Sequence, residues 1–211
     1  MSAEGAYEPA QRNSFTVTSG AVLTVDMSLA IPQTPDGGLP ATLELTSDQP
    51  IVAGMRQFFG GKRVQDETAF SAGAQPFTGP AAVSGLPVRD ATDVRLAITA
   101  PEEDAEVDIV LLPFTGGKEI SPPTAPRRLK IPSGTVKNIK LEAPAGVDWF
   151  TAIVTPTENS GPILAAHRVR EKSRYGDLIT GYPWSPLRIV VEVPTADQNA
   201  GVVMRRAAAS S

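Results

Sequence analysis

His167 is the only histidine in the chain, and cysteine is absent. Disulfides, a thiolate nucleophile and a cysteine-bound zinc site are therefore excluded, and no site can use a second histidine. In an internal repeat described below, Met55 takes the position of His167. Since a position that accepts methionine is a packing position, we expect His167 to be a hydrogen-bonded structural residue rather than a general base.

An arginine and an aspartate recur in step along the chain, as Arg56 with Asp66 and as Arg168 with Asp177. Each pair is interpretable as a ligand site or as a cross-strand ion pair, and the ion pair is the simpler interpretation. A hydrolase would need the two carboxyl groups in one pocket, about 5 to 9 Å apart. The spacing of the repeat disfavours that convergence.

Two further patterns resemble ligand sites. The acidic stretch from Glu102 to Asp108 offers oxygen ligands for calcium, but it lacks the Asp-x-Asp-x-Asp-Gly spacing, so a solvated turn between two strands is expected. Phe59-Gly-Gly-Lys62 and Thr115-Gly-Gly-Lys118 lack the spacing of a phosphate-binding loop and favour two-residue hairpin turns. With no nucleophile elbow in the sequence, we expect no catalytic residues, metal or cofactor, and no enzyme.

Aromatic side chains gather near the C-terminal end, where Tyr182 and Trp184 follow Tyr175. An exposed, coplanar pair formed by Tyr182 and Trp184 would suit a sugar ring. Small sandwiches also need large rings between their sheets, and we expect Trp149, Phe150 and Trp184 to lie mostly in the core.

The elements that carry these residues are short β-type runs bounded by Gly, Pro, Asp or Ser. Alternation places Val25, Met27 and Leu29 on one face of the run that begins at residue 21, and Leu43 and Leu45 repeat the pattern. No window shows the spacing of an amphipathic helix. The sequence therefore predicts an all-β protein with antiparallel sheets.

The runs repeat at a spacing of about 112 residues. Pro50-Ile-Val-Ala-Gly-Met-Arg answers Pro162-Ile-Leu-Ala-Ala-His-Arg, which indicates a duplication. We expect two tandem immunoglobulin-like sandwiches, with a single fused sandwich as the alternative. The first module is assigned to residues 15–88 and is completed by C-terminal strands in 187–206, the second to 89–186, and the tails to 1–14 and 207–211. A hairpin-like pair, 93–99 and 106–112, precedes the second copy.

The net charge of -4 and the pI near 5.1 give no basic surface for nucleic acid. No apolar stretch reaches the length of about 18 residues that a membrane span needs, and the first residues lack the pattern of an export signal. We expect any contact with a membrane to go through an anchor or a partner outside this chain.

Thr46-Ser-Asp-Gln-Pro-Ile-Val-Ala-Gly-Met-Arg, with the downstream aspartate and an Ala/Ser-rich stretch, resembles a family of uncharacterised actinobacterial exported proteins. Its members carry repeated Pro-Val-Val-Ala-Gly-like strands in secreted or membrane-anchored envelope proteins. The resemblance implies an extracytoplasmic envelope protein and supplies no catalytic residues. The sequence thus predicts a non-enzymatic interaction or structural module whose partner is another envelope protein. Binding of a carbohydrate or cell-wall polymer is the alternative.

Overall fold

The structure is a computed structural model that describes residues 1–8, 13–27, 42–59, 67–116, 118–119, 122–174 and 176–187. Within these ranges the regular elements are all β-strands, and the sheets are antiparallel. The described residues contain no helix long and apolar enough to cross a membrane. The strands are β1 (Gly54–Phe59), β2 (Glu67–Ala72), β3 (Ala81–Pro87), β4 (Thr92–Ala100), β5 (Ala105–Thr115), β6 (Lys118–Glu119), β7 (Arg127–Ile131), β8 (Thr135–Lys140), β9 (Trp149–Pro156), β10 (Leu164–Ser173) and β11 (Gly176–Pro183).

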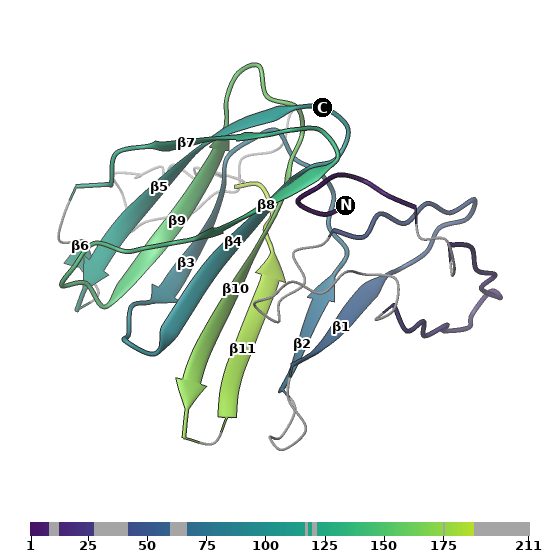
Figure 1. The fold of residues 1–211 in the computed structure, drawn as a ribbon, viewed down its shortest axis with the longest axis horizontal. Helices are drawn as coiled ribbons and strands as arrows, with labels where there is room; N and C mark the ends of the chain where they lie inside the picture. Colours follow the sequence, from purple (N-terminus) through teal and green to yellow (C-terminus); the bar gives the residue numbers. More distant parts are fainter. Residues whose placement is uncertain are drawn as a thin grey trace, which may run out of the picture.

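Two sheets pack face to face as a β-sandwich (Figure 1). The order is β11-β10-β4-β8 in one sheet and β3-β9-β5-β6 in the other, where β7 also pairs with β5. The inner faces carry the alternating apolar residues of each strand, such as Leu96 and Ile98 of β4 and Val107 of β5, all fully buried. Phe150 and Trp184 fill the space between the sheets. This core confirms the all-β sandwich that the alternation predicts.

The hairpin β1–β2 lies beside the sandwich, with β2 next to β11 (Figure 1). It covers part of the outer face of the four-stranded sheet, where Ile179 of β11 is buried beneath it. The start of the chain lies beside β8, the edge strand of the same sheet. The sequence predicts an unattached tail over residues 1–14, whereas Ser2 forms a parallel bridge with Thr135 and its carbonyl accepts a hydrogen bond of 2.9 Å from the Val136 amide.

Several strand partners differ from the predicted modules. β3 lies in the stretch assigned to the first module, yet it pairs with β9 of the second. The runs 93–99 and 106–112 are strands, as predicted, but they belong to opposite sheets rather than to one hairpin. Each run has a continuous apolar face, and facing sheets let both faces enter one core.

Of the strands predicted in the early part of the chain, the run 50–59 contains β1, whereas the runs before it do not pair in the described residues. Residues 21–27 and 42–47 form no strand, and Val22 is 94% exposed. Alternation indicates which face of a strand is apolar, but it does not determine which other strand pairs with it. The C-terminal strands predicted in 187–206, except for Leu187, and the tail 207–211 lie outside the described residues. Leu187 itself donates a backbone hydrogen bond to Pro80, beside β3.

Candidate functional site

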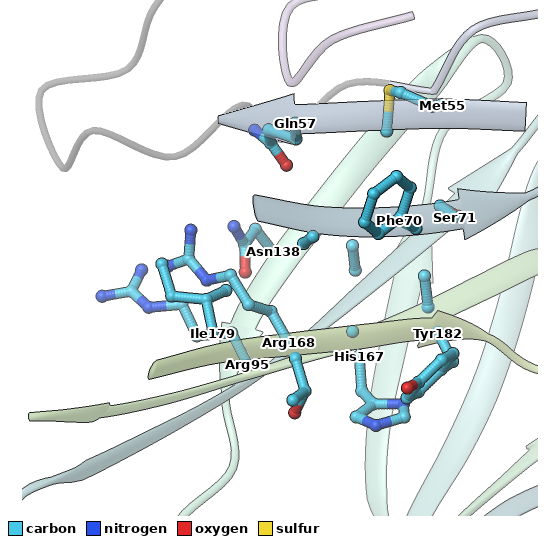
Figure 2. Close-up of a pocket in the computed structure, with 15 residues that line it drawn as sticks. Met55, Gln57, Phe70, Ser71, Arg95, Asn138, His167, Arg168, Ile179 and Tyr182 are labelled. Atoms are coloured by element: carbon cyan, nitrogen blue, oxygen red, sulfur yellow. The ribbon is translucent and has the colours of Figure 1, made fainter. Parts of the chain in front are cut away.

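A cleft separates the hairpin β1–β2 from the outer face of the four-stranded sheet. Figure 2 shows Met55 and Gln57 on β1 above it, and Arg95, Arg168 and Asn138 on the strands of the sheet. Its volume is about 140 Å³, roughly the room taken by four or five water molecules. Sites for drug-sized ligands are usually about 300 to 1,000 Å³. The cleft therefore suits a single side chain better than a cofactor or a sugar.

Small residues make the floor of this cleft. Ala166 of β10 is directly opposite Ala97 of β4, and Gly181 of β11 is opposite Arg168. A Cβ atom on Gly181 would lie 2.7 Å from the backbone oxygen of His167, too close for any larger residue to fit without a backbone shift. The absence of long side chains at these three positions keeps the space under the hairpin open.

The predicted pairing of Arg168 with Asp177 is wrong. Asp177 pairs with Arg170 of the same hairpin, while the nearest guanidinium nitrogen of Arg168 lies 3.9 Å from Asp93 Oδ2. Arg170 and Asp177 lie on the same face of β10 and β11, where the register makes them diagonal neighbours. An ion pair of this second copy therefore exists, but it uses the arginine two residues further along the strand.

Arg56 and its predicted partner are not brought together in what the structure describes. Asp66 lies outside the described residues, so the ion pair of the first copy stays a prediction. The guanidinium carbon of Arg56 stands 4.7 Å from the ring centroid of Phe58, a cation–π contact. Phe58 and Phe70 are 61% and 65% exposed, and Phe70 is directly opposite Arg56.

His167 has a structural role in the sandwich. It points to the side of the sheet opposite the cleft, as Figure 2 shows, and its Nδ1 accepts a hydrogen bond of 3.0 Å from Trp184 Nε1. Burial lowers the pKa of His167, and a hydrogen bond with the backbone of Tyr182 opposes this effect. Because Nδ1 is an acceptor, the neutral imidazole is the form that satisfies both neighbours. The geometry fits a packing histidine.

The sugar platform is contradicted by the burial of one of its two rings. Tyr182 is 62% exposed, but Trp184 is 4% exposed and lies in the core. Two of the three aromatic residues predicted to lie in the core, Phe150 and Trp184, are buried there. Trp149 is 39% exposed, because it belongs to the outer face of β9, and Arg89 stands over its ring at 5.6 Å.

The loops expected to be structural have structural contacts. Asp104 of the acidic turn accepts a hydrogen bond of 2.7 Å from the Ser133 amide, which joins two loops at one end of the sandwich. Thr115 pairs directly with Lys118, which leaves a two-residue Gly-Gly connection as predicted. The second such loop, at Gly60–Gly61, lies outside the described residues. In the described part of the chain, no three acidic or histidine side chains gather as a metal site.

Sequence reasoning missed a row of cations on the outer face of the four-stranded sheet, of which Arg95 and Arg168 line the cleft. Arg168 is directly opposite Arg95, and Arg95 is directly opposite Lys140, so the three side chains share the outer face of neighbouring strands. Because Arg95 alternates with apolar Val94 and Leu96, the sequence predicts that Arg95 lies on the face of the strand opposite the core. Nothing in the sequence reveals which strands bring the three together.

No family model matches the chain, and no curated protein matches it. Among solved structures it is similar to the Thermotoga maritima protein 1070, at 11% identity and a TM-score of 0.42, over 52% of this chain and 95% of that one. It is also similar to the Anabaena sensory rhodopsin transducer, at 22% identity and a TM-score of 0.32, over 42% of this chain and 79% of that one. Likenesses at these scores assign no function to the chain.

Proposed function

We propose that this chain is a non-enzymatic, extracytoplasmic module of the cell envelope that binds another protein through the hairpin β1–β2. We also propose that its fold arose by duplication of an immunoglobulin-like module. The observation that carries the function is the outward face of the hairpin, where Phe58 and Phe70 are both more than half exposed and Arg56 stacks on Phe58. Aromatic residues and arginine are enriched where proteins bind one another.

The segment that precedes β1 in the sequence also carries exposed apolar residues. Leu45, Ile51 and Val52 are exposed in the segment that leads into β1, and they form no strand there. Isolated apolar residues on a surface are ordinary, but a run of them beside exposed aromatic rings is typical of an interaction site. The small volume of the cleft also favours insertion of a side chain over capture of a small ligand.

The carbohydrate alternative has less support. A sugar site of the proposed kind needs two exposed coplanar rings, and Trp184 is buried. Tyr182 remains exposed and supplies a single ring. We therefore rank protein binding first and use polysaccharide as a competing ligand in the test.

The test is retention of envelope proteins and of isolated wall polysaccharide from the source organism by the immobilised chain. The wild type is compared with a Phe58→Ser, Phe70→Ser double variant. Leu178→Ser on β11 is the control, because Leu178 is 54% exposed and lies outside the hairpin. We expect one protein partner to be retained by the wild type and by Leu178→Ser and lost by the double variant. Retention of polysaccharide alone, or equal retention by all three chains, contradicts the proposal.

A further inference from the structure

The hairpin β1–β2 leaves one edge of β1 open in the part of the chain that the structure describes. β2 pairs with one side of β1 and lies next to β11, and no described strand pairs with the other side (Figure 1). The Gly73 amide donates a hydrogen bond of 3.1 Å to the Ala53 carbonyl, and the antiparallel register continues from this pair. Every second residue of β1 therefore turns its backbone groups away from β2, namely Gly54, Arg56 and Phe58.

This open edge lacks the features by which outer strands usually avoid pairing with another chain. Among the other outer strands, β8 carries two lysines, β7 carries two arginines and a lysine, and a register shift interrupts β3. β1 has no lysine or proline, and its register with β2 is continuous. Its one charged side chain, Arg56, lies over the ring of Phe58 on the same face. The backbone groups at this edge are therefore available to a further strand.

We propose that this further strand is β1 of a second copy of the chain, paired antiparallel about a two-fold axis at Gln57. This register places Arg56 of each copy opposite Phe58 of the other, so a guanidinium meets an aromatic ring twice across the pair. An axis at Arg56 would set two arginines opposite each other, which destabilises a sheet. An axis at Phe58, near the end of β1, would leave less of each strand paired.

The pairing extends each hairpin into one sheet with the order β2-β1-β1-β2 across the two copies. A two-stranded hairpin is marginally stable by itself, and further strands stabilise it. Phe58 and Phe70 lie on the same face of the hairpin, so the rings of both copies share one face of the extended sheet. Because the pairing uses the backbone edge of β1, this aromatic face stays exposed. The inference therefore goes beyond the proposed function and does not depend on an envelope partner.

The first experiment is sedimentation velocity of the purified full chain from about 1 μM to 1 mM. Since β1 has six residues, the contact is small, and we expect a weak, reversible dimer in this range. Arg56→Pro removes an amide at the open edge and no hydrogen bond to β2, and it weakens dimerisation at least about tenfold. Lys140→Pro is the control. The Leu141 amide donates to Val94, so the Lys140 amide faces the outer edge of β8, and its loss leaves dimerisation unchanged.

The second experiment tests the register with single-cysteine variants, which are clean because the chain has no cysteine. Gln57 turns its backbone groups toward β2, so the two copies of residue 57 face each other with Cα atoms about 4.5 Å apart, a distance that a disulfide spans. In a glutathione redox buffer, Gln57→Cys should form a linked dimer at least about tenfold faster than Met55→Cys. Met55 is the matched control, because it shares a face of β1 with Gln57 but lies away from the axis.

Three results overturn the inference: a monomer at every concentration, dimerisation unchanged by Arg56→Pro, or equal cross-linking of Gln57→Cys and Met55→Cys. If the unfolding curve shows that Arg56→Pro does not fold, the cysteine variants decide the question by themselves. Both experiments use the purified chain alone. A monomer that still retains an envelope protein through Phe58 and Phe70 leaves the proposed function standing and removes only this inference.

Discussion

Replacing Trp184 with phenylalanine is expected to destabilise the sandwich and to raise the pKa of His167. The indole of Trp184 is buried and donates a hydrogen bond of 3.0 Å to His167 Nδ1. A phenyl ring keeps most of the packing but leaves Nδ1 as a buried acceptor without its donor. Such an orphaned group costs about 1 to 3 kcal/mol, and the smaller ring leaves a cavity, so we expect a loss of about 2 to 4 kcal/mol.

The hydrogen bond is separated from the packing by a double-mutant cycle. His167→Met supplies the matched background, because methionine has no acceptor of comparable strength and occupies the corresponding position at Met55. Denaturant unfolding at pH 7.5 gives the four free energies. We expect Trp184→Phe to cost at least about 1 kcal/mol less in the His167→Met chain than in the wild type. A coupling below about 0.3 kcal/mol is within ordinary additivity and would refute the role of this hydrogen bond.

The pKa of His167 is measured directly, since the only histidine gives a single imidazole signal. Burial holds the folded-state pKa below its ordinary value. The stabilising effect of the neutral imidazole is therefore fully present above about pH 6.5 and is lost as the pH falls toward the folded-state pKa. The slope from this one group is at most about 1.4 kcal/mol per pH unit. Trp184→Phe raises the pKa because Nδ1 becomes free to take the proton.

Three further substitutions test the geometry. Gly181→Ala places a Cβ atom 2.7 Å from a backbone oxygen, so we expect denaturant unfolding to show a loss of about 1 to 3 kcal/mol; Gly79→Ala, whose Cβ meets nothing within 4 Å, should change stability by no more than about 1 kcal/mol. Leu96→Ala, at a fully buried position of β4, should cost about 2 to 5 kcal/mol in the same assay. Arg128→Gln should raise the pKa of Asp108, whose carboxyl is now held below its usual pKa by the Arg128 hydrogen bonds, and carboxyl NMR signals measure the change.

Local patterns in the sequence predicted the strands of the sandwich but not their partners. Alternation in 93–99 and 106–112 predicts which faces are buried, because the apolar side chains at every second position lie on the same face of the strand. The choice of partner depends on contacts between segments far apart in the chain. For this reason β3, assigned to the first module, pairs with β9. The immunoglobulin-like duplication remains a prediction.

In the candidate site, too, features set by adjacent residues were predictable, whereas features set by the pairing of distant strands were not. The turn that joins Thr115 to Lys118 depends on two adjacent glycines and was predictable. The partner of Asp177 depends on the register of β10 and β11, in which Ser173 pairs with Gly176 and Arg168 therefore meets Gly181. A shift of two residues exchanges one arginine for another on the same face. The cation row requires three strands in register, which no single segment of sequence specifies.

Site-specific photocrosslinking from the hairpin tests the central claim most directly. A photoreactive phenylalanine analogue replaces Phe58. In a control chain the same analogue replaces Thr155, an exposed residue of β9 in the five-stranded sheet. Each chain is irradiated with envelope fractions of the source organism, and the adducts are identified by mass spectrometry. The account predicts a discrete adduct with one envelope protein from position 58, absent from position 155 and abolished by excess unmodified chain. Identical adducts from both positions, or no adduct from position 58, would contradict it.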